Sequence, residues 1–220
     1  MRSVIAIDGP AGVGKSSVSR RLAEALGWTY LDTGAMYRAL TLAWLEAGGS
    51  EELLADADWI AGRNLDMAED RVLLDGRDVS EAIREARVNA QVSLVAAAPK
   101  VRANLTAMQR RIGDRRPCVL DGRDIGTVVF PDAFFKVFLT ASDEVRARRR
   151  WLQEGGEQGQ HDLAEILADL RRRDQIDSSR ALAPLRQAPD ALAVDTDDLD
   201  EDGVLALLRE EAQKRLEKTR

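Results

Sequence analysis

Three glycines, a lysine and a hydroxyl side chain are grouped near the start of the chain, in the run Gly9-Pro10-Ala11-Gly12-Val13-Gly14-Lys15-Ser16. The spacing is G-x-x-x-x-G-K-S, in which glycines let successive backbone N–H groups turn toward one anion. The lysine adds a compact cation for the β- and γ-phosphates, and the serine hydroxyl can hold a magnesium ion that bridges them. These residues predict a site for a nucleoside triphosphate together with Mg²⁺.

The segments on either side of this loop support the prediction. Residues 4–7 form a short apolar run, typical of a parallel strand buried on both faces, and residues 16–26 predict a helix. The amino end of this helix would add a favourable field for anions. The alternative interpretation is a glycine-rich strand-to-helix turn that binds no ligand. The predicted ATP-binding residues are Gly9, Pro10, Ala11, Gly12, Val13, Gly14, Lys15, Ser16 and Ser17.

The rest of the chain alternates predicted strands and helices. Further strands are expected at residues 28–31, 118–120, 134–139 and 192–194, and helices at 34–47 and 203–218. Strand–helix alternation over this length favours an α/β fold with a five-stranded parallel sheet, right-handed crossovers and flanking helices. We expect a single P-loop kinase domain that spans residues 1–220.

Two segments interrupt this alternation. In residues 63–85, polar and apolar side chains alternate around Asp75-Gly76, a strong hairpin signal, so we expect a small antiparallel insertion. Residues 143–180 are rich in both arginine and acidic side chains and contain Gly155-Gly156. Two solvated helices with a flexible connection would explain this composition. The sharper interpretation, and the one that we expect, is a helical lid over residues 143–180 whose arginines close on a polyanion.

Composition excludes several classes of protein. The chain has 220 residues, a formal net charge of −6 and 5% aromatic residues, which gives no footprint for a nucleic acid polymer. Cys118 is the only cysteine, which excludes an intramolecular disulfide framework and an all-cysteine metal cage; His161 is the only histidine, which leaves almost no material for histidine triads or zinc sites. Without a signal peptide or an apolar run that could span a membrane, we expect a cytoplasmic protein. We also expect a monomer.

The class of triphosphate-binding protein can be narrowed from the same residues. A guanine-specific GTPase would carry Asn-Lys-x-Asp, but no asparagine of this chain, namely Asn64, Asn89 and Asn104, precedes a lysine. A large motor ATPase would need a longer chain. A small kinase that moves the γ-phosphoryl group onto an acceptor remains.

Four segments carry a resemblance to a known family. They are the phosphate loop, the run from Asp32 to Arg38, the run from Asp121 to Pro131, and Arg173-Asp174 with Asp177 and Arg180. With Ser93 and Arg102 they extend over nearly the whole chain, which resembles the bacterial cytidylate kinases. The resemblance implies phosphoryl transfer from ATP to CMP, and to dCMP, and identifies residues 63–85 as the family's monophosphate-binding insertion.

The resemblance also implies a role for individual residues. Arg38, Arg123 and Arg173 correspond to residues that hold the acceptor's phosphate, where fixed cations offset the repulsion between two anions. Ser93, Arg102 and Asp124 correspond to residues that face the base. Thr33 and Asp177 correspond to residues near the ribose, and Tyr37 to a wall of the pocket. Arg180 is the last of the predicted substrate-binding residues. Lys15, Arg123 and Arg173 are the predicted catalytic residues, with Ser16 and Asp121, the latter through water, at the metal.

Two alternatives remain open from the sequence. One is a kinase of another small acceptor, such as UMP, AMP or a shikimate-like molecule. The other is a nucleotide-sensing protein without turnover, although a sensor has no need to neutralise a second phosphate. The sequence also leaves open which of Arg146, Arg148, Arg149 and Arg150 reaches ATP.

Overall fold

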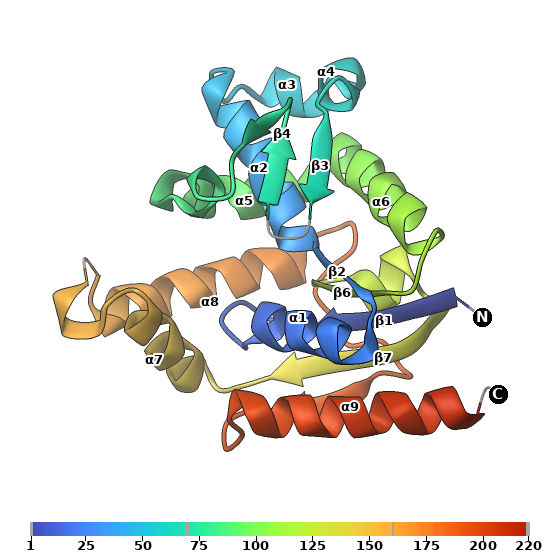
Figure 1. Ribbon diagram of the computed structural model, residues 1–220. Helices are drawn as coiled ribbons and strands as arrows, with labels where there is room; N and C mark the ends of the chain where they lie inside the picture. The colour runs from blue at the N-terminus through green and yellow to red at the C-terminus, as the bar shows by residue number, and fades with distance from the viewer. Residues whose placement is uncertain (1, 69–70, 160, 219–220) are drawn as a thin grey trace. The chain divides into compact units, whose positions relative to one another are not determined.

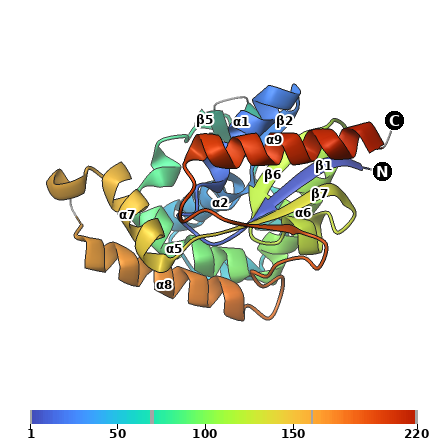
Figure 2. The ribbon, with the colours of Figure 1, turned by 90° about the horizontal axis from the view of Figure 1, so that it is seen from below.

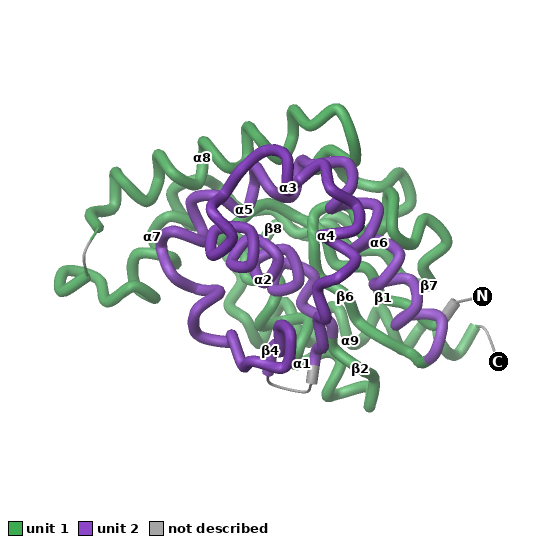
Figure 3. Tube along the Cα trace, turned by 90° about the horizontal axis from the view of Figure 1, so that it is seen from above, with its two compact units in different colours: residues 1–30, 116–220 green, residues 31–115 purple. Residues whose placement is uncertain are grey.

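The computed structural model describes residues 2–68, 71–159 and 161–218 (Figure 1). Residues 69–70 of the predicted insertion and residue 160 of the predicted lid region lie outside the described part. The described chain divides into two compact units, residues 1–30 with 116–220 and residues 31–115, coloured separately in Figure 3. The division into two units tests neither the single domain predicted over residues 1–220 nor the lid predicted over residues 143–180, and both stay predictions.

The first unit is built on a parallel sheet, although the last two residues of its strand β2 are counted with the second unit. The sheet order is β2-β6-β1-β7-β8, with strands β1 (Arg2–Asp8), β2 (Thr29–Asp32), β6 (Cys118–Gly122), β7 (Ala133–Thr140) and β8 (Leu192–Asp195). β1 pairs in parallel with both β6 and β7, and residues 4–7 of β1 are fully buried. This sheet confirms the predicted five-stranded parallel α/β fold. The apolar run at residues 4–7 predicted its central strand, because a strand covered on both faces has no polar side.

Helices cover this sheet and extend from one end of it. They are α1 (Lys15–Leu26), α7 (Asp143–Gln153), α8 (Leu163–Ser179) and α9 (Glu201–Lys218), with short helical turns η2 (Ile125–Val129) and η3 (Gly156–Gln158). α9 lies beside α1, where Leu208 and Ala212 are buried against the apolar face of the sheet (Figure 2). α7 and α8 pack on each other through a separate cluster that includes Ala147, Ile166 and Leu170.

The second unit combines helices with a small antiparallel sheet. It contains α2 (Thr33–Glu46), α3 (Glu51–Ala55), α4 (Ala57–Ala61), β3 (Leu65–Ala68), β4 (Arg71–Leu74), β5 (Arg77–Asp78), η1 (Ala82–Arg84), α5 (Ala86–Ala97) and α6 (Pro99–Gly113). The turn between β4 and β5 is Asp75-Gly76, with φ angles of 52° and 81°. Two left-handed residues are what a two-residue hairpin turn requires, so the predicted antiparallel insertion is confirmed.

Candidate active site

The phosphate loop joins the end of β1 to the start of α1. Gly14 immediately precedes the helix and has a φ of 88°, a left-handed backbone conformation that would be strained for any residue with a side chain. Gly9 is constrained differently, since a Cβ there would lie 2.3 Å from the carbonyl oxygen of Leu139 in β7. The loop therefore presents backbone rather than side chains beside the first turn of α1, which is the geometry that phosphate binding needs.

Lys15 lies buried beneath this loop. Its side chain is 6% exposed, and Nζ donates a hydrogen bond of 2.5 Å to the carbonyl oxygen of Pro10. Burial, followed by the nearby guanidinium of Arg123, holds the pKa of Lys15 well below its usual range, and three carboxylates oppose this shift: Asp121, Asp8 and Asp174. A phosphate anion in the loop would favour the charged ammonium, so ligand binding and the charge of Lys15 are coupled.

A hydroxyl and a carboxylate meet beside Lys15. Ser16 Oγ donates to Asp121 Oδ2 at 2.8 Å, and Tyr30 donates its hydroxyl hydrogen to Asp121 Oδ1 at 2.9 Å. Asp121 lies in β6 and is 4% exposed. This pair fits a magnesium ion brought by a nucleotide, because Mg²⁺ binds through one or two protein oxygens, the substrate phosphates and water. Within the described residues, no cluster of three or more acidic, histidine or cysteine side chains could hold a metal alone.

Charged residues of α8, together with Arg123 directly after β6 and Arg180 directly after α8, converge in the same unit. Arg123 Nε donates to Asp177 Oδ2 at 2.9 Å, and Arg180 also pairs with Asp177. Burial would raise the pKa of Asp177, but the charges of Arg123, Arg180 and Arg173 outweigh it and lower that pKa. The structure therefore brings four predicted acceptor residues together: Arg123, Arg173, Asp177 and Arg180. Asp124, next along the chain, is 4% exposed.

The remaining predicted acceptor residues lie in the second unit. Thr33, Tyr37 and Arg38 belong to α2, Ser93 to α5 and Arg102 to α6. The Arg102 guanidinium lies 5.6 Å from the centre of the Tyr37 ring and donates to the carbonyl oxygen of Ala96 at 3.1 Å. These contacts keep a buried cation oriented. Thr33 and Ser93 are both nearly fully buried.

Several positioning contacts were not predicted from the sequence. Arg38 Nε donates to Asn89 Oδ1 at 3.3 Å, which orients a predicted phosphate ligand. Asp8 accepts hydrogen bonds from the amides of Ile125 and Gly126. A polar side chain next to a motif has no pattern of its own, so neither Asn89 nor Asp8 could be identified without coordinates.

Arg146 of α7 reaches the phosphate loop. It is 3% exposed, and Nη1 donates to the carbonyl oxygen of Ala11 at 2.9 Å and to Asp174 of α8 at 2.5 Å. Asp174 in turn accepts from the Ala11 amide at 3.3 Å. The sequence left open which of four arginines reaches ATP, and these contacts join Arg146 to the phosphate loop. Arg149 instead donates to the carbonyl oxygens of Thr196 and Leu199. The predicted lid helices thus contact the loop backbone directly.

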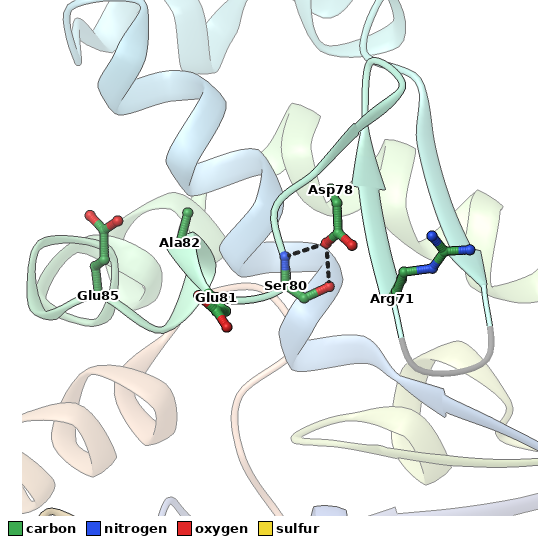
Figure 4. Close-up of a pocket in the computed structure, with 6 residues that line it drawn as sticks. All are labelled: Arg71, Asp78, Ser80, Glu81, Ala82 and Glu85. Carbon is green, nitrogen blue, oxygen red and sulfur yellow. Dashed lines mark hydrogen bonds between the residues drawn. The ribbon is translucent and has the colours of Figure 1, made fainter.

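A separate pocket lies in the second unit, between β4, β5 and η1 (Figure 4). Its volume is about 690 Å³, and its lining residues are Arg71, Asp78, Ser80, Glu81, Ala82 and Glu85. Asp78 accepts from both the amide and the hydroxyl of Ser80, as the dashed lines in Figure 4 show. None of the predicted site residues lines this pocket.

The fold and the first unit's loop, lysine and serine–aspartate pair define a P-loop phosphotransferase. Residues 5–214 match the family model described as cytidylate kinase. The chain is 49% identical to a cytidylate kinase of Mycolicibacterium paratuberculosis, with 99% of this chain and 98% of that protein aligned. It is 51% identical to a cytidylate kinase of Rhodococcus jostii, with 93% and 92% aligned. The chain belongs to the cytidylate kinase family.

A solved structure supports the fold alone. An uncharacterised protein from Eubacterium ventriosum aligns with a TM-score of 0.56 at 12% identity, over 97% of this chain and 99% of that one. Within residues 2–68, 71–159 and 161–218, no helix combines the length and apolar character needed to cross a bilayer.

Proposed function

We propose that this protein transfers the γ-phosphoryl group of ATP to CMP, and also to dCMP, forming ADP and CDP or dCDP. Membership of the cytidylate kinase family supports the reaction. The observation that carries the proposal is the pairing, within one unit, of a phosphate loop over buried Lys15 with the cationic group Arg123, Arg173 and Arg180 around Asp177.

Phosphoryl transfer of this kind depends on positioning and charge. A phosphate oxygen of the acceptor is already ionised near neutral pH, so the reaction needs no general base. Lys15 and the loop amides would hold the β- and γ-phosphates, while Arg38, Arg123 and Arg173 would hold the acceptor's phosphate against electrostatic repulsion. Ser16, and Asp121 through water, would hold Mg²⁺, which supplies charge neutralisation between the β- and γ-phosphates when bound.

We assign selection of the base to Asp124, Arg102 and Ser93. Cytosine offers an exocyclic amine that a carboxylate such as Asp124 accepts. Its ring N3 and O2 are acceptors, for which an arginine or a hydroxyl is a suitable donor. Uracil presents an acceptor where cytosine has its amine, so Asp124 would face an unpaired oxygen, at a cost of about 1–3 kcal/mol. We assign Thr33 and Asp177 to the ribose, and Tyr37 to the wall of the pocket.

Closure of residues 143–180 over bound nucleotides would exclude water and prevent wasteful ATP hydrolysis. Limited proteolysis within residues 153–162 tests this closure. We expect protection when ATP and CMP are both present, and equal cleavage with and without them would contradict it. We also propose that the protein works as a monomer in the cytoplasm.

A coupled assay of ADP formation with CMP, dCMP, UMP, AMP and GMP tests the function. We expect kcat/KM to be highest for CMP and dCMP, with UMP at least about tenfold lower. Equal rates with CMP and AMP would refute the assignment of the base-reading residues. ATP binding without turnover on any of the five acceptors would instead favour a nucleotide sensor.

A further inference from the structure

Asp8 is a buried carboxylate that the proposed reaction does not use. It is the last residue of β1, directly before the first glycine of the phosphate loop, and is 3% exposed. Its two oxygens hold two successive amides of another segment: Oδ1 accepts from Ile125 N–H at 2.8 Å, and Oδ2 accepts from Gly126 N–H at 2.7 Å. A carboxylate that is removed from water in this way is costly unless its hydrogen bonds are satisfied.

The segment that Asp8 holds begins at Asp124. Asp124 precedes the π-helical turn η2, and its carbonyl oxygen accepts from the amides of Val128 and Val129 at 2.9 and 3.1 Å. The turn closes when Phe130 N–H donates to the carbonyl oxygen of Ile125 at 2.7 Å. Two of the proposed substrate residues, Arg123 and Asp124, therefore lie immediately before the pair of amides that Asp8 binds.

The side chain of Lys136 in β7 also lies close to Gly126. A Cβ added to Gly126 would lie 3.2 and 3.3 Å from the Lys136 side chain and 3.4 Å from Asp8 Oδ2. Lys136 is itself fixed, because Nζ donates to the carbonyl oxygen of Pro131 at 2.5 Å and to Asp190 at 2.9 Å. A methyl group at Gly126 would therefore require Lys136 or the turn to move by a few tenths of an ångström.

The surroundings of Asp8 disfavour its charged form. Burial raises its pKa to about 7, the two amides oppose this shift, and among the neighbouring charges Asp124 raises the pKa while Lys15 lowers it. A neutral residue of similar shape would avoid the desolvation of the charge. It would, however, lack two equivalent acceptors for the two parallel amides.

We propose that Asp8 is a positioning residue, which by binding the Ile125 and Gly126 amides fixes Arg123 and Asp124 for the acceptor nucleotide. The inference rests on the proposed function. Because Asp8 directly precedes the phosphate loop, one strand end then orients both the ATP-binding backbone and the residues that select the base. A role in folding alone predicts something different, since it would change the amount of active protein without changing the choice between acceptors.

The direct test is Asp8→Asn, assayed with CMP and UMP at saturating ATP. Asparagine keeps the shape but has only one acceptor oxygen, so its NH₂ group would oppose one of the two amides. We expect the KM for CMP to rise about tenfold or more, and the CMP-to-UMP ratio of kcat/KM to fall by a similar factor. Changes in ATP binding cannot produce the altered ratio, because both acceptors use the same ATP.

Gly126→Ala provides a second variant that leaves Asp8 intact and pushes the turn away from it. We expect the same direction of change in the CMP-to-UMP ratio. Asp190→Asn is the matched control, because it removes the charge of a carboxylate that pairs with Lys136, while Lys136 Nζ keeps its bond to the Pro131 carbonyl oxygen and the two amides keep Asp8 as their acceptor. We expect it to keep the wild-type ratio.

Circular dichroism and thermal unfolding identify any variant that fails to fold, in which case the other variant decides. Unchanged ratios in folded Asp8→Asn and Gly126→Ala would overturn the positioning role. If the wild-type enzyme shows no preference for CMP, or if Asp124→Ala retains the preference, the proposed function or its base-reading assignment fails instead. The two failures are therefore distinguishable.

Discussion

The phosphate loop and the acceptor residues of the second unit differ in how their chemistry is built. The loop is nine consecutive residues, and most of its groups that would bind phosphate are backbone amides held by one strand end and one helix start. The acceptor residues of the second unit are side chains distributed over α2, α5 and α6, each oriented by a different neighbour, such as Asn89 for Arg38 and the Tyr37 ring for Arg102. Substitutions should therefore act differently in the two regions.

The largest effect is expected at the loop, from Lys15→Ala. The variant removes the cation proposed for the β- and γ-phosphates, so kcat with CMP should fall about 10²–10³-fold. Since Lys15 is buried with a lowered pKa, its loss should not unfold the protein. Steady-state kinetics with a thermal unfolding control measures both quantities. Phosphoryl transfer at the wild-type rate would overturn the catalytic assignment.

Two neighbouring arginines of α8 sharpen the comparison on the acceptor side. Arg173→Ala should lower kcat/KM for CMP about 10²-fold, because Arg173 is assigned to the acceptor's phosphate. Arg172 is the matched control, since its exposed side chain pairs only with Asp169 among the ion pairs of the described residues. Arg172→Ala should keep wild-type kinetics. Equal losses in the two variants would refute a specific role for Arg173.

The contact between the lid helices and the loop can be broken at Arg146. Arg146→Ala removes a buried guanidinium from Asp174 and from the Ala11 carbonyl, so we expect a loss of about 3 kcal/mol in the free energy of unfolding and a raised KM for ATP. Arg171→Ala, which breaks exposed pairs with Asp143 and Glu144, should leave both quantities near wild type. Urea denaturation and ATP kinetics decide; a stable Arg146→Ala variant would contradict the prediction.

The raised pKa of Asp8 should make the free energy of unfolding depend on pH near neutrality. Its pKa is raised to about 7 in the folded protein, against roughly 3.9 when unfolded, so the folded state binds the extra proton between these values. Stability from this group is therefore complete below about pH 4 and is lost as the pH rises toward 7.

Relative to Asp8→Asn, the wild type should lose about 2–3 kcal/mol in the free energy of unfolding from pH 5 to pH 8. Urea denaturation of both proteins at the two pH values measures this difference. Parallel pH profiles for the two proteins would show that the pKa of Asp8 is not raised.

The same comparison explains which parts of the molecule the sequence could predict. The parallel sheet follows from apolar runs such as residues 4–7, and the β4–β5 hairpin follows from Asp75-Gly76, because both signals are local. The helices α3 to α6 were not predicted in detail. Helix packing depends on contacts between distant residues: in the second unit, Val88 of α5 is buried in one cluster with residues of α2 and β4.

The candidate site divides along the same line. The loop residues were predicted from their spacing alone, whereas Ser93 and Arg102 were identified only through the family resemblance, since nothing in the composition of α5 or α6 distinguishes them. Asp8 and Arg146 needed coordinates. The amides that Asp8 binds, and the Ala11 carbonyl oxygen that Arg146 binds, lie more than a hundred residues away in the chain, and no local pattern records such a contact.

Calorimetric titration of CMP, and of UMP, into the wild-type protein and Asp124→Ala tests the central claim most directly. The claim is that a buried carboxylate beside a cationic phosphate site selects cytosine by its amine. We predict that CMP binds the wild type with measurable heat and at least about tenfold more tightly than UMP, and that the substitution abolishes this preference. Absence of CMP binding, or an unchanged preference in Asp124→Ala, would contradict the account.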